Sequence, residues 1–388
     1  MAAGGLAALV LGLIAAVALA DGRHPADGGS AQPSMPTPTA TPTSVASSQA
    51  PTPAPGSAGK TSTDIYSGIE SSALAPQVAN IPVRVYVPNN YSNDVSVIDP
   101  KTFKVIYTFP AGKDPQHITP SWDMKHLYVG NAYSNTLTEV DPRTGRPVRT
   151  ISVPDPYNLY FTPDGKSAID VAEGLDMIFF YDPKTWRLKG SVHIPYRGPD
   201  HMDFSADGSY LLISTEYAGR LIKIDVATRR IVASVELGGS LVDVKLAPDG
   251  KVFYVANQRR GGVSVINPTK MSEIAFVPTG NGAHGFAVSR NTKDLYVSNR
   301  LAGSISVISF ATNEVVHTWV VGGSPDMLQV SADGTQLWTT NRFNASVSVI
   351  DTRTGKLLHT IAVGQQPHGL TLFPQPGNYS LGHNGVYR

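Results

Sequence analysis

The sequence predicts an all-β fold, a seven-bladed β-propeller of four-stranded blades. Three observations predict it: a repeat of about 42 residues, short segments of alternating apolar and polar residues, and tight-turn dipeptides between those segments. Four short strands in a repeat of this length are typical of a propeller blade. No long stretch of helical periodicity interrupts the repeats. The 388 residues are therefore expected to hold one repeat domain with appendages at both ends.

Seven repeats align on one large apolar residue each: Tyr86, Tyr128, Ile169, Leu212, Tyr254, Tyr296 and Trp338. Five of them carry an asparagine three residues later: Asn89, Asn131, Asn257, Asn299 and Asn341. Around each anchor the pattern has period two, as in Leu295–Asn299 and Ser304–Ile308, which predicts strands. Asp-Gly steps such as Asp164-Gly165 and Asp249-Gly250 supply the positive φ that tight hairpins need.

The points within the repeat at which the chain begins and ends predict how the ring closes. The chain enters the first repeat at Val83–Val87, a second strand, and leaves the last at His368–Phe373, an innermost strand. The last strand should therefore complete the first blade, which removes open sheet edges and joins the chain ends. We place the propeller at residues 81–374, a lead-in segment at 65–80 and a C-terminal tail at 375–388.

The repeats resemble those of a known family. Arg84–Asn89, Phe253–Asn257 and Leu295–Asn299 are similar to YVTN β-propeller repeats over residues 81–374, with a weaker fit in the third and fourth repeats. The resemblance implies an exported or surface-layer-like propeller. It does not fix a function, because that family includes binding modules, envelope proteins and relatives of lactonases and lyases.

The N-terminal residues look like a targeting segment and a tether. Residues 1–20 contain an apolar run from Leu6 that ends in Ala18-Leu19-Ala20, which indicates a secretory signal peptide. No basic residue precedes that run, so an uncleaved anchor stays the alternative. Residues 21–64 are rich in Pro, Ser, Thr and Ala and predict a disordered linker. The expected location is extracytoplasmic: secreted, periplasmic or at the cell surface.

Composition excludes several classes of function. Lys+Arg 31 against Asp+Glu 30 leaves no basic excess for a nucleic-acid backbone. The absence of cysteine excludes disulfides, thiolate metal sites and a Cys nucleophile. We expect a monomer that meets a membrane only through its N-terminal segment, if that segment is retained.

One column of the repeat alignment is rich in histidine. It lies just before each innermost strand, at one mouth of the expected channel, and contains His117, Asn158, His201, Asp243, His284, Met327 and His368. Imidazoles gathered there could hold a metal ion, bind an anionic or aromatic ligand, or act as acid and base. The alternative is a structural feature inherited with the repeat.

Charged residues near this column divide into two arcs. Glu173, Glu216, Asp200, Asp203 and Asp243 form an acidic arc that suits a cation, whereas an anion would prefer the opposite arc with Arg259, Arg260, Arg300 and Arg342. An ordinary solvated rim is the alternative reading. The tail could fold over one mouth, which would add His383 as a ligand, or it could be frayed.

Two functions follow. The favoured one is an exported binding module that takes a small molecule, a metal ion or an envelope protein at the histidine-lined mouth. Its ligand candidates are the seven residues of the column with Arg300 and Arg342. The alternative is a metal-assisted lyase or lactonase in which His201, Glu216 and His284 act, so whether the protein is an enzyme stays open. The cofactor candidate is a divalent ion such as zinc or magnesium, with these candidate ligands: His117, His201, His284, His368, Glu173, Glu216 and His383.

Overall fold

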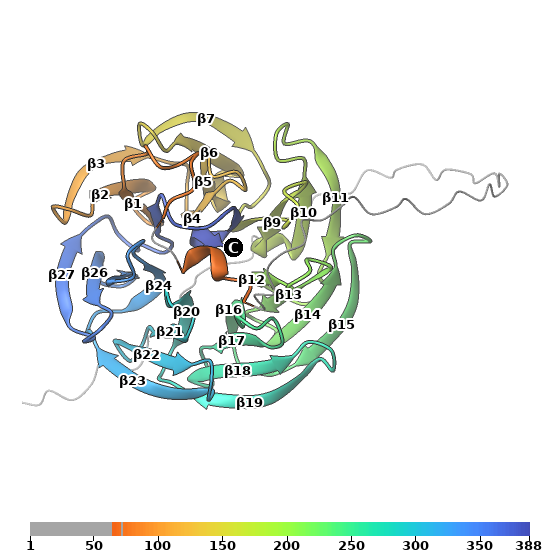
Figure 1. The fold of residues 1–388 in the computed structure, drawn as a ribbon. Coiled ribbons are helices and arrows are strands. Elements are labelled where there is room, and N and C mark those ends of the chain that lie inside the picture. The colour runs from red at the N-terminus through yellow and green to blue at the C-terminus, as the bar shows by residue number, and fades with distance from the viewer. Residues whose placement is uncertain (1–63, 71–72) are drawn as a thin grey trace, which may run out of the picture. The chain divides into compact units, whose positions relative to one another are not determined.

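A computed structural model describes residues 64–70 and 73–388. They form seven antiparallel sheets that surround a central channel, as Figure 1 shows. This confirms the predicted seven-bladed propeller of four-stranded blades. The predicted leader (1–20) and all but the last residue of the predicted linker (21–64) lie outside the described residues. Within the described part of the chain, no helix is both long enough and apolar enough to cross a bilayer.

The strands have the following bounds in chain order: β1 (Arg84–Asn89), β2 (Asp94–Asp99), β3 (Lys104–Pro110), β4 (Pro115–Pro120), β5 (Leu127–Asn131), β6 (Thr136–Asp141), β7 (Arg146–Ser152), β8 (Asn158–Phe161), β9 (Ala168–Ala172), β10 (Met177–Tyr181), β11 (Leu188–His193), β12 (Pro199–Phe204), β13 (Tyr210–Thr215), β14 (Arg220–Asp225), β15 (Arg230–Glu236), β16 (Leu241–Leu246), β17 (Phe253–Asn257), β18 (Gly262–Asn267), β19 (Ser272–Pro278), β20 (Ala283–Val288), β21 (Asp294–Asn299), β22 (Ser304–Ser309), β23 (Glu314–Val320), β24 (Pro325–Val330), β25 (Gln336–Asn341), β26 (Ser346–Asp351), β27 (Leu357–Ala362), β28 (Thr371–Phe373), β29 (Ser380–Gly382) and β30 (Val386–Tyr387). Short 3-10 helices are η1 (Ser67–Ile69), η2 (Ala132–Ser134), η3 (Glu173–Leu175) and η4 (His383–Gly385).

The ring closes as the phase of the sequence predicts. The last inner strand, β28, pairs antiparallel with β1, with Leu372 opposite Val85. The first blade therefore has the strand order β28-β1-β2-β3 and combines both ends of the propeller. Because one blade contains both chain ends, the ring has no free edge there.

The repeated asparagines stand at the end of the second strand of a blade and make hydrogen bonds to the third strand. Asn341 Nδ2 donates to Ser346 Oγ at 3.1 Å and to Ser348 Oγ at 2.9 Å, across the turn into the third strand. Asn299 makes the same pair of bonds to Ser304 and Ser306. These bonds satisfy the buried amide nitrogen and fix each turn beside the channel mouth.

The C-terminal tail enters the channel, which departs from a plain four-stranded blade. Gly382 of β29 pairs with Tyr160 of β8, and β30 pairs with β29. The sheet that contains β8 therefore has six strands, in the order β11-β10-β9-β8-β29-β30. The tail is ordered rather than frayed, and Figure 1 shows the C-terminus at the centre of the ring.

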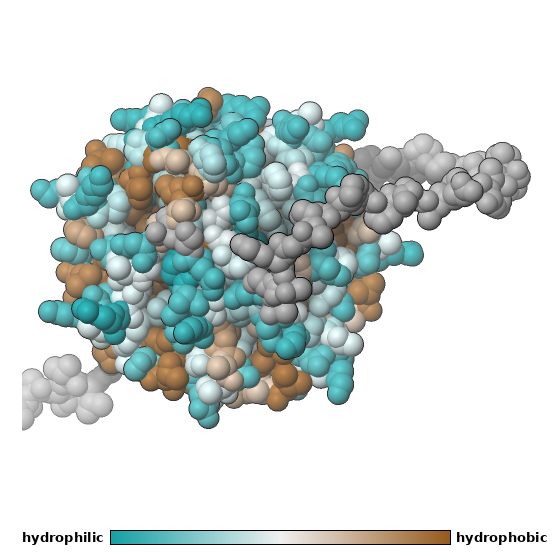
Figure 2. All heavy atoms as spheres, in the orientation of Figure 1, coloured by the Kyte–Doolittle hydropathy of each residue, from teal (hydrophilic) through white to brown (hydrophobic). Residues whose placement is uncertain are grey.

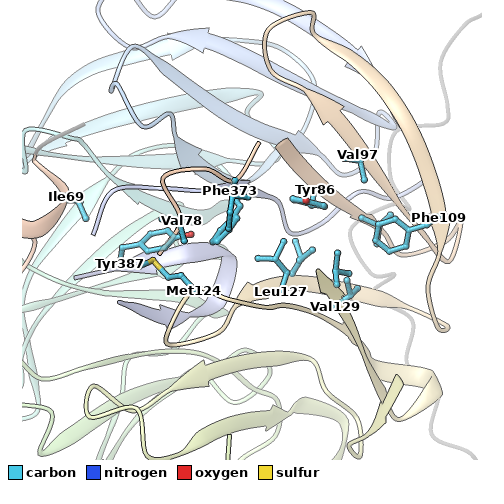
Figure 3. Packing of buried hydrophobic residues seen from close by; sticks show 14 of the residues in the cluster. Ile69, Val78, Tyr86, Val97, Phe109, Met124, Leu127, Val129, Phe373 and Tyr387 are labelled. Carbon is cyan, nitrogen blue, oxygen red and sulfur yellow. The ribbon is translucent and has the colours of Figure 1, made fainter. Parts of the chain in front are cut away.

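The lead-in segment packs on the same end of the channel. Ile69 and Val78 belong to one buried apolar cluster with Phe373 and Tyr387, and Figure 3 shows these side chains next to one another. Tyr66 Oη donates to the Leu246 carbonyl oxygen at 3.0 Å. Lead-in and tail together fill the channel end at which the inner strands finish.

The outer strands face solvent. Val148, Val232 and Val316 belong to outermost strands and are exposed. On the face in Figure 2, such hydrophobic residues are separated by hydrophilic ones. The opposite end of the channel, where the inner strands begin, contains the histidines.

Candidate metal centre in the channel

The inner strands begin with an irregularity at the histidine column. In β4 the register shifts between Pro115 and Ile118, so His117 lies in a bulge, and β12 has the same shift around His201. Equivalent shifts occur in β16, β20 and β24. A bulge of this kind redirects a side chain, and bulges are frequent at functional sites. In β4, β12 and β20 the bulges coincide with histidines that lie in the channel.

Five of the ten histidines gather in the channel. The His117 ring centre lies 4.5 Å from that of His368 and 5.2 Å from those of His201 and His383. The His201 ring is 4.6 Å from that of His383 and 6.3 Å from that of His284. All five side chains are buried. The structure therefore brings four column residues together with the tail residue His383.

An oxygen acceptor orients several of these rings. His201 Nδ1 lies 2.6 Å from Asp200 Oδ1, and His368 Nδ1 lies 2.8 Å from Gln116 Oε1. His383 Nδ1 lies 3.2 Å from Asn158 Oδ1. The Gln116 and Asn158 oxygens can only accept, so in the neutral rings of His368 and His383 the proton is on Nδ1 and the lone pair is on Nε2. Metal-binding histidines are oriented in this way.

Two sets of ligand atoms converge. One imidazole nitrogen from each of His117, His201 and His383 lies within 4.8 Å of the other two. A second set with the same spacing joins His284, Asp326 and His368. Each set combines elements far apart in the sequence, and the first one needs the tail.

In the second set, His284 and Asp326 already interact with each other and with Arg300. His284 Nδ1 lies 2.9 Å from Asp326 Oδ1, and its Nε2 lies 2.5 Å from Arg300 Nη2. Arg300 also donates from Nη2 to Asp326 Oδ1 at 2.6 Å. Both ring nitrogens of His284 therefore have partners, and Asp326 neutralises Arg300. This arrangement is a closed ion-pair network rather than an open metal site.

Burial and neighbouring charges set the protonation of the cluster. Burial and the Arg300 guanidinium lower the pKa of His284, and burial and Arg342 hold the pKa of His368 well below its ordinary value. Burial lowers the pKa of His383 to about 4, with Asp243 opposing. Burial also acts to lower the pKa of His201, but Asp200 outweighs it and the pKa is raised. Three rings are therefore neutral near pH 7.

The remaining column residues have different surroundings. Asn158 Nδ2 donates to Tyr160 Oη at 3.2 Å, and Asp243 Oδ1 lies 3.8 Å from His383 Nε2. Met327 packs in an apolar cluster that includes Trp338 and Leu370. In that blade the residue that reaches the histidines is Asp326, which the column alignment did not select. The step Pro325-Asp326 repeats Pro199-Asp200 and was the signal that could have found it.

The structure places only some of the residues of the predicted acidic arc at the histidine end of the channel. Burial, then Asp200, Glu173 and Glu216, raise the pKa of Tyr157, so these carboxylates do share one side of the mouth. The acidic arc was wrong for one member. Asp203 lies at the opposite end of the channel, where its Oδ1 accepts from Arg388 Nη2 at 2.9 Å, because it follows the bulge of β12 and faces the tail.

The predicted basic arc included two arginines that do not lie beside the histidines. Arg342 Nη1 lies 3.9 Å from Asp326 Oδ2, so Arg342 joins Arg300 beside the histidines. Arg259 is exposed, and Arg260 pairs with Glu273 on the outer side of the blade at 3.0 Å. The two inward arginines both stand four residues after their anchors, whereas Arg259 and Arg260 stand five and six residues after Tyr254, so the exact offset from the anchor separates them.

An apolar rim surrounds the mouth. In the turns that follow second strands, five blades expose one large side chain at an equivalent position: Tyr91, Tyr133, Tyr217, Leu301 and Phe343. These turns lie beside the starts of the inner strands, because Asn131 pairs with Pro115. Exposed apolar residues gathered at one rim are typical of a contact surface.

Comparison with known proteins gives the family. The profile of the YNCE-like beta-propellers matches residues 65–376. This chain belongs to the YNCE-like β-propeller family. The expectation of a propeller family is thereby confirmed, and the narrower YVTN type stays a prediction. No curated protein matches the chain.

Solved structures share the fold of this YNCE-like propeller at low identity. Hydrazine synthase of Kuenenia stuttgartiensis is 22% identical with a TM-score of 0.62, over 72% of this chain and 97% of that one. A putative 6-phosphogluconolactonase of Bacteroides uniformis is 18% identical with a TM-score of 0.62, over 75% and 99%. Dihydro-heme d1 dehydrogenase NirN, in complex with DHE, is 17% identical with a TM-score of 0.58, over 75% of each chain. At these identities the similarity concerns the fold.

Proposed function

We propose that this YNCE-like propeller is an extracytoplasmic protein that binds one divalent transition-metal ion at His117, His201 and His383. The observation that carries the proposal is the convergence of one nitrogen from each ring within 4.8 Å. The apolar run that begins at Leu6 supports the extracytoplasmic location.

The residues fit such an ion. His201 is fully buried, and its Nε2 has no hydrogen-bond partner among the described residues. A buried polar atom without a partner is costly, and a metal ion would satisfy it. Nitrogen ligands suit zinc and its neighbours, whereas magnesium prefers oxygen, so the donor set favours the zinc class over magnesium.

Surrounding residues would prepare the site. Asp200 and Asn158 hold the Nδ1 atoms of His201 and His383 and so direct each Nε2 inward. Arg300 and Asp326 contact the two ring nitrogens of His284, so we do not count His284 among the metal ligands. An ion of the zinc class held by these three rings would keep a further coordination position available. A small molecule or a side chain of a partner protein could fill that position.

The apolar rim supports a contact at this mouth. Tyr91 is 71% exposed and Phe343 is 53% exposed, at equivalent turns of neighbouring blades. Aromatic residues at the edge of a polar pocket are typical of surfaces that contact a ligand or a partner. The chain is proposed to act as a monomer, because one ring contains all the ligands.

A second candidate is the metal-assisted lactonase or lyase. It is favoured by Arg300 and Arg342, two buried guanidinium groups beside the histidines that could bind an anionic substrate. Glu216, whose Oε1 accepts from Gln258 Nε2 at 3.0 Å, could move a proton. His284 would hold a charge network rather than act on substrate.

Metal titration tests the proposal. The full chain, freed of metal with a chelator, is titrated with zinc in a calorimeter. We expect one equivalent to bind, and His201→Ala and His383→Ala each to weaken binding at least tenfold. His193→Ala, at an exposed histidine, should bind as the wild type does. Equal binding by all four proteins would refute the site. Turnover of a lactone panel by the zinc-loaded protein would favour the second candidate.

A further inference from the structure

A small cavity lies in the channel where the tail and the lead-in segment close it. Its volume is ≈ 60 Å³, and its lining includes Lys245, Arg290 and Tyr387. A buried water needs about 10–15 Å³ of such volume, so the cavity has room for a few waters or one small ion. It borders the first set of converging histidines, because His383 forms part of its wall.

Two cationic side chains face this cavity. Lys245, on β16, is 3% exposed. Arg290 follows β20, and its Nη2 donates to the carbonyl oxygens of Val330 and Ser331 at 3.1 Å and to Gln375 Oε1 at 2.7 Å. These three acceptors are neutral, so they solvate the guanidinium without balancing its charge.

The cations at this end of the channel differ in their acidic neighbours. Asp203 is paired with Arg388; burial acts to raise the pKa of Asp243, and Lys245 is the charged group that most lowers it. Arg290 has no ion pair with a carboxylate of the described residues; the carboxylate that attracts it, Asp333, lies on an exposed turn. Burial lowers the pKa of Arg290 to about 10. Among the described residues, Arg290 is therefore held by neutral acceptors.

Two donors on the cavity wall lack acceptors. Arg290 Nε and Tyr387 Oη make no hydrogen bond within the described part of the chain, and Tyr387 is 5% exposed. The two groups interact electrostatically, so they lie near each other. Buried donors without acceptors beside a cation that neutral acceptors hold are the features that an anion would satisfy.

We propose that this cavity binds one small monovalent anion of the chloride class, held by Arg290, Lys245 and Tyr387. The volume excludes large organic anions, and one guanidinium held by neutral acceptors among the described residues fits a monovalent ion. Because Tyr387 belongs to β30, the anion would also link the tail to the inner strands β16 and β20. The two proposed sites share His383, but the anion proposal does not require a metal ion at the histidines.

Bromide locates the ion directly. Crystals of the full chain are grown in sodium bromide, and data are collected at the bromine edge. We expect an anomalous peak within hydrogen-bonding distance of Arg290 Nε and Tyr387 Oη. Water without an anomalous peak at this position, in crystals that contain molar bromide, would overturn the proposal.

Stability in solution gives a second readout. Urea unfolding is followed in chloride and in gluconate at equal ionic strength, because gluconate is too large for the cavity. We expect the ratio of folded to unfolded protein to rise about tenfold when chloride reaches about ten times its dissociation constant. Equal stability in the two salts would contradict the site.

Variants connect the effect to the cavity. Tyr387→Phe removes one donor and keeps the ring, and it should raise the dissociation constant for chloride several-fold. Tyr91→Phe, at an exposed position, is the matched control and should leave it unchanged. Lys245→Met should abolish the chloride effect; if that variant does not fold, the bromide peak and Tyr387→Phe decide. A chloride effect that persists unchanged in Tyr387→Phe would overturn the assignment.

Discussion

Asp170 offers a quantitative test of how the blades are built. It lies on β9, is fully buried, and neither carboxylate oxygen has a hydrogen-bond partner among the described residues. The six equivalent positions are all buried and none is charged: Val87, Val129, Ile213, Val255, Val297 and Thr339. We therefore predict that Asp170→Val stabilises the propeller near neutral pH.

The size of the effect follows from the carboxyl pKa. Burial first, and then Asp155, raises the pKa of Asp170 well above 3.8. The folded state thus keeps a proton that the unfolded state releases, so stability is full below the unfolded pKa and falls as pH rises toward the folded pKa. The loss is about 1.4 kcal/mol per pH unit, which gives up to about 4 kcal/mol at pH 7.

Urea unfolding at several pH values measures this difference. We expect the free energy of unfolding of Asp170→Val to exceed that of the wild type by about 2–4 kcal/mol at pH 7 and by much less at pH 4. Asp170→Asn, which does not titrate, should lose the same pH dependence while gaining less stability. A difference between wild type and Asp170→Val that is constant from pH 4 to pH 7 would refute the reasoning.

Three further predictions concern the site and the tail. Asp200→Ala should weaken zinc binding about 10–100-fold, measured by calorimetry, because Asp200 orients His201; unchanged binding would contradict that role. In metal-free protein, His383→Gln should reduce the loss of stability between pH 6.5 and pH 4 by about 3 kcal/mol, measured by urea unfolding. The unfolded state binds the proton in that range, whereas burial lowers the pKa of folded His383 to about 4, so stability falls as pH falls. Gly382→Ala should cost about 2 kcal/mol or expose the tail to protease, because φ is +94° and a Cβ would lie 2.5 Å from the Leu159 oxygen; wild-type stability and protection would contradict this.

The architecture was predictable because a propeller repeats its local rules. The period-two pattern around each anchor specifies which side chains face the core, and the phase of the first and last repeats specifies the closure that β28 and β1 form. The Asp-Gly turns also behave as expected, with φ of +66° at Gly165 and +72° at Gly250. The period-two pattern and the turns depend on residues close together in the sequence, and the closure follows from where the first and last repeats begin and end.

The site was less predictable because it depends on long-range packing. The alignment column located four histidines, but a bulge in β24 directs Asp326 to His284, while Met327 packs in the core. The tail has no repeat to align with, so its pairing with β8 could not be read from a pattern. Its contribution of His383 was one of two alternatives until the structure positioned it.

The most direct test is the position of zinc in the folded protein. Crystals of zinc-loaded full chain, measured at the zinc edge, should give one strong anomalous peak in the channel. We predict nitrogen ligands from His117, His201 and His383 at about 2.0–2.1 Å. A channel without zinc, or zinc only at exposed histidines such as His193 and His317, would contradict the account.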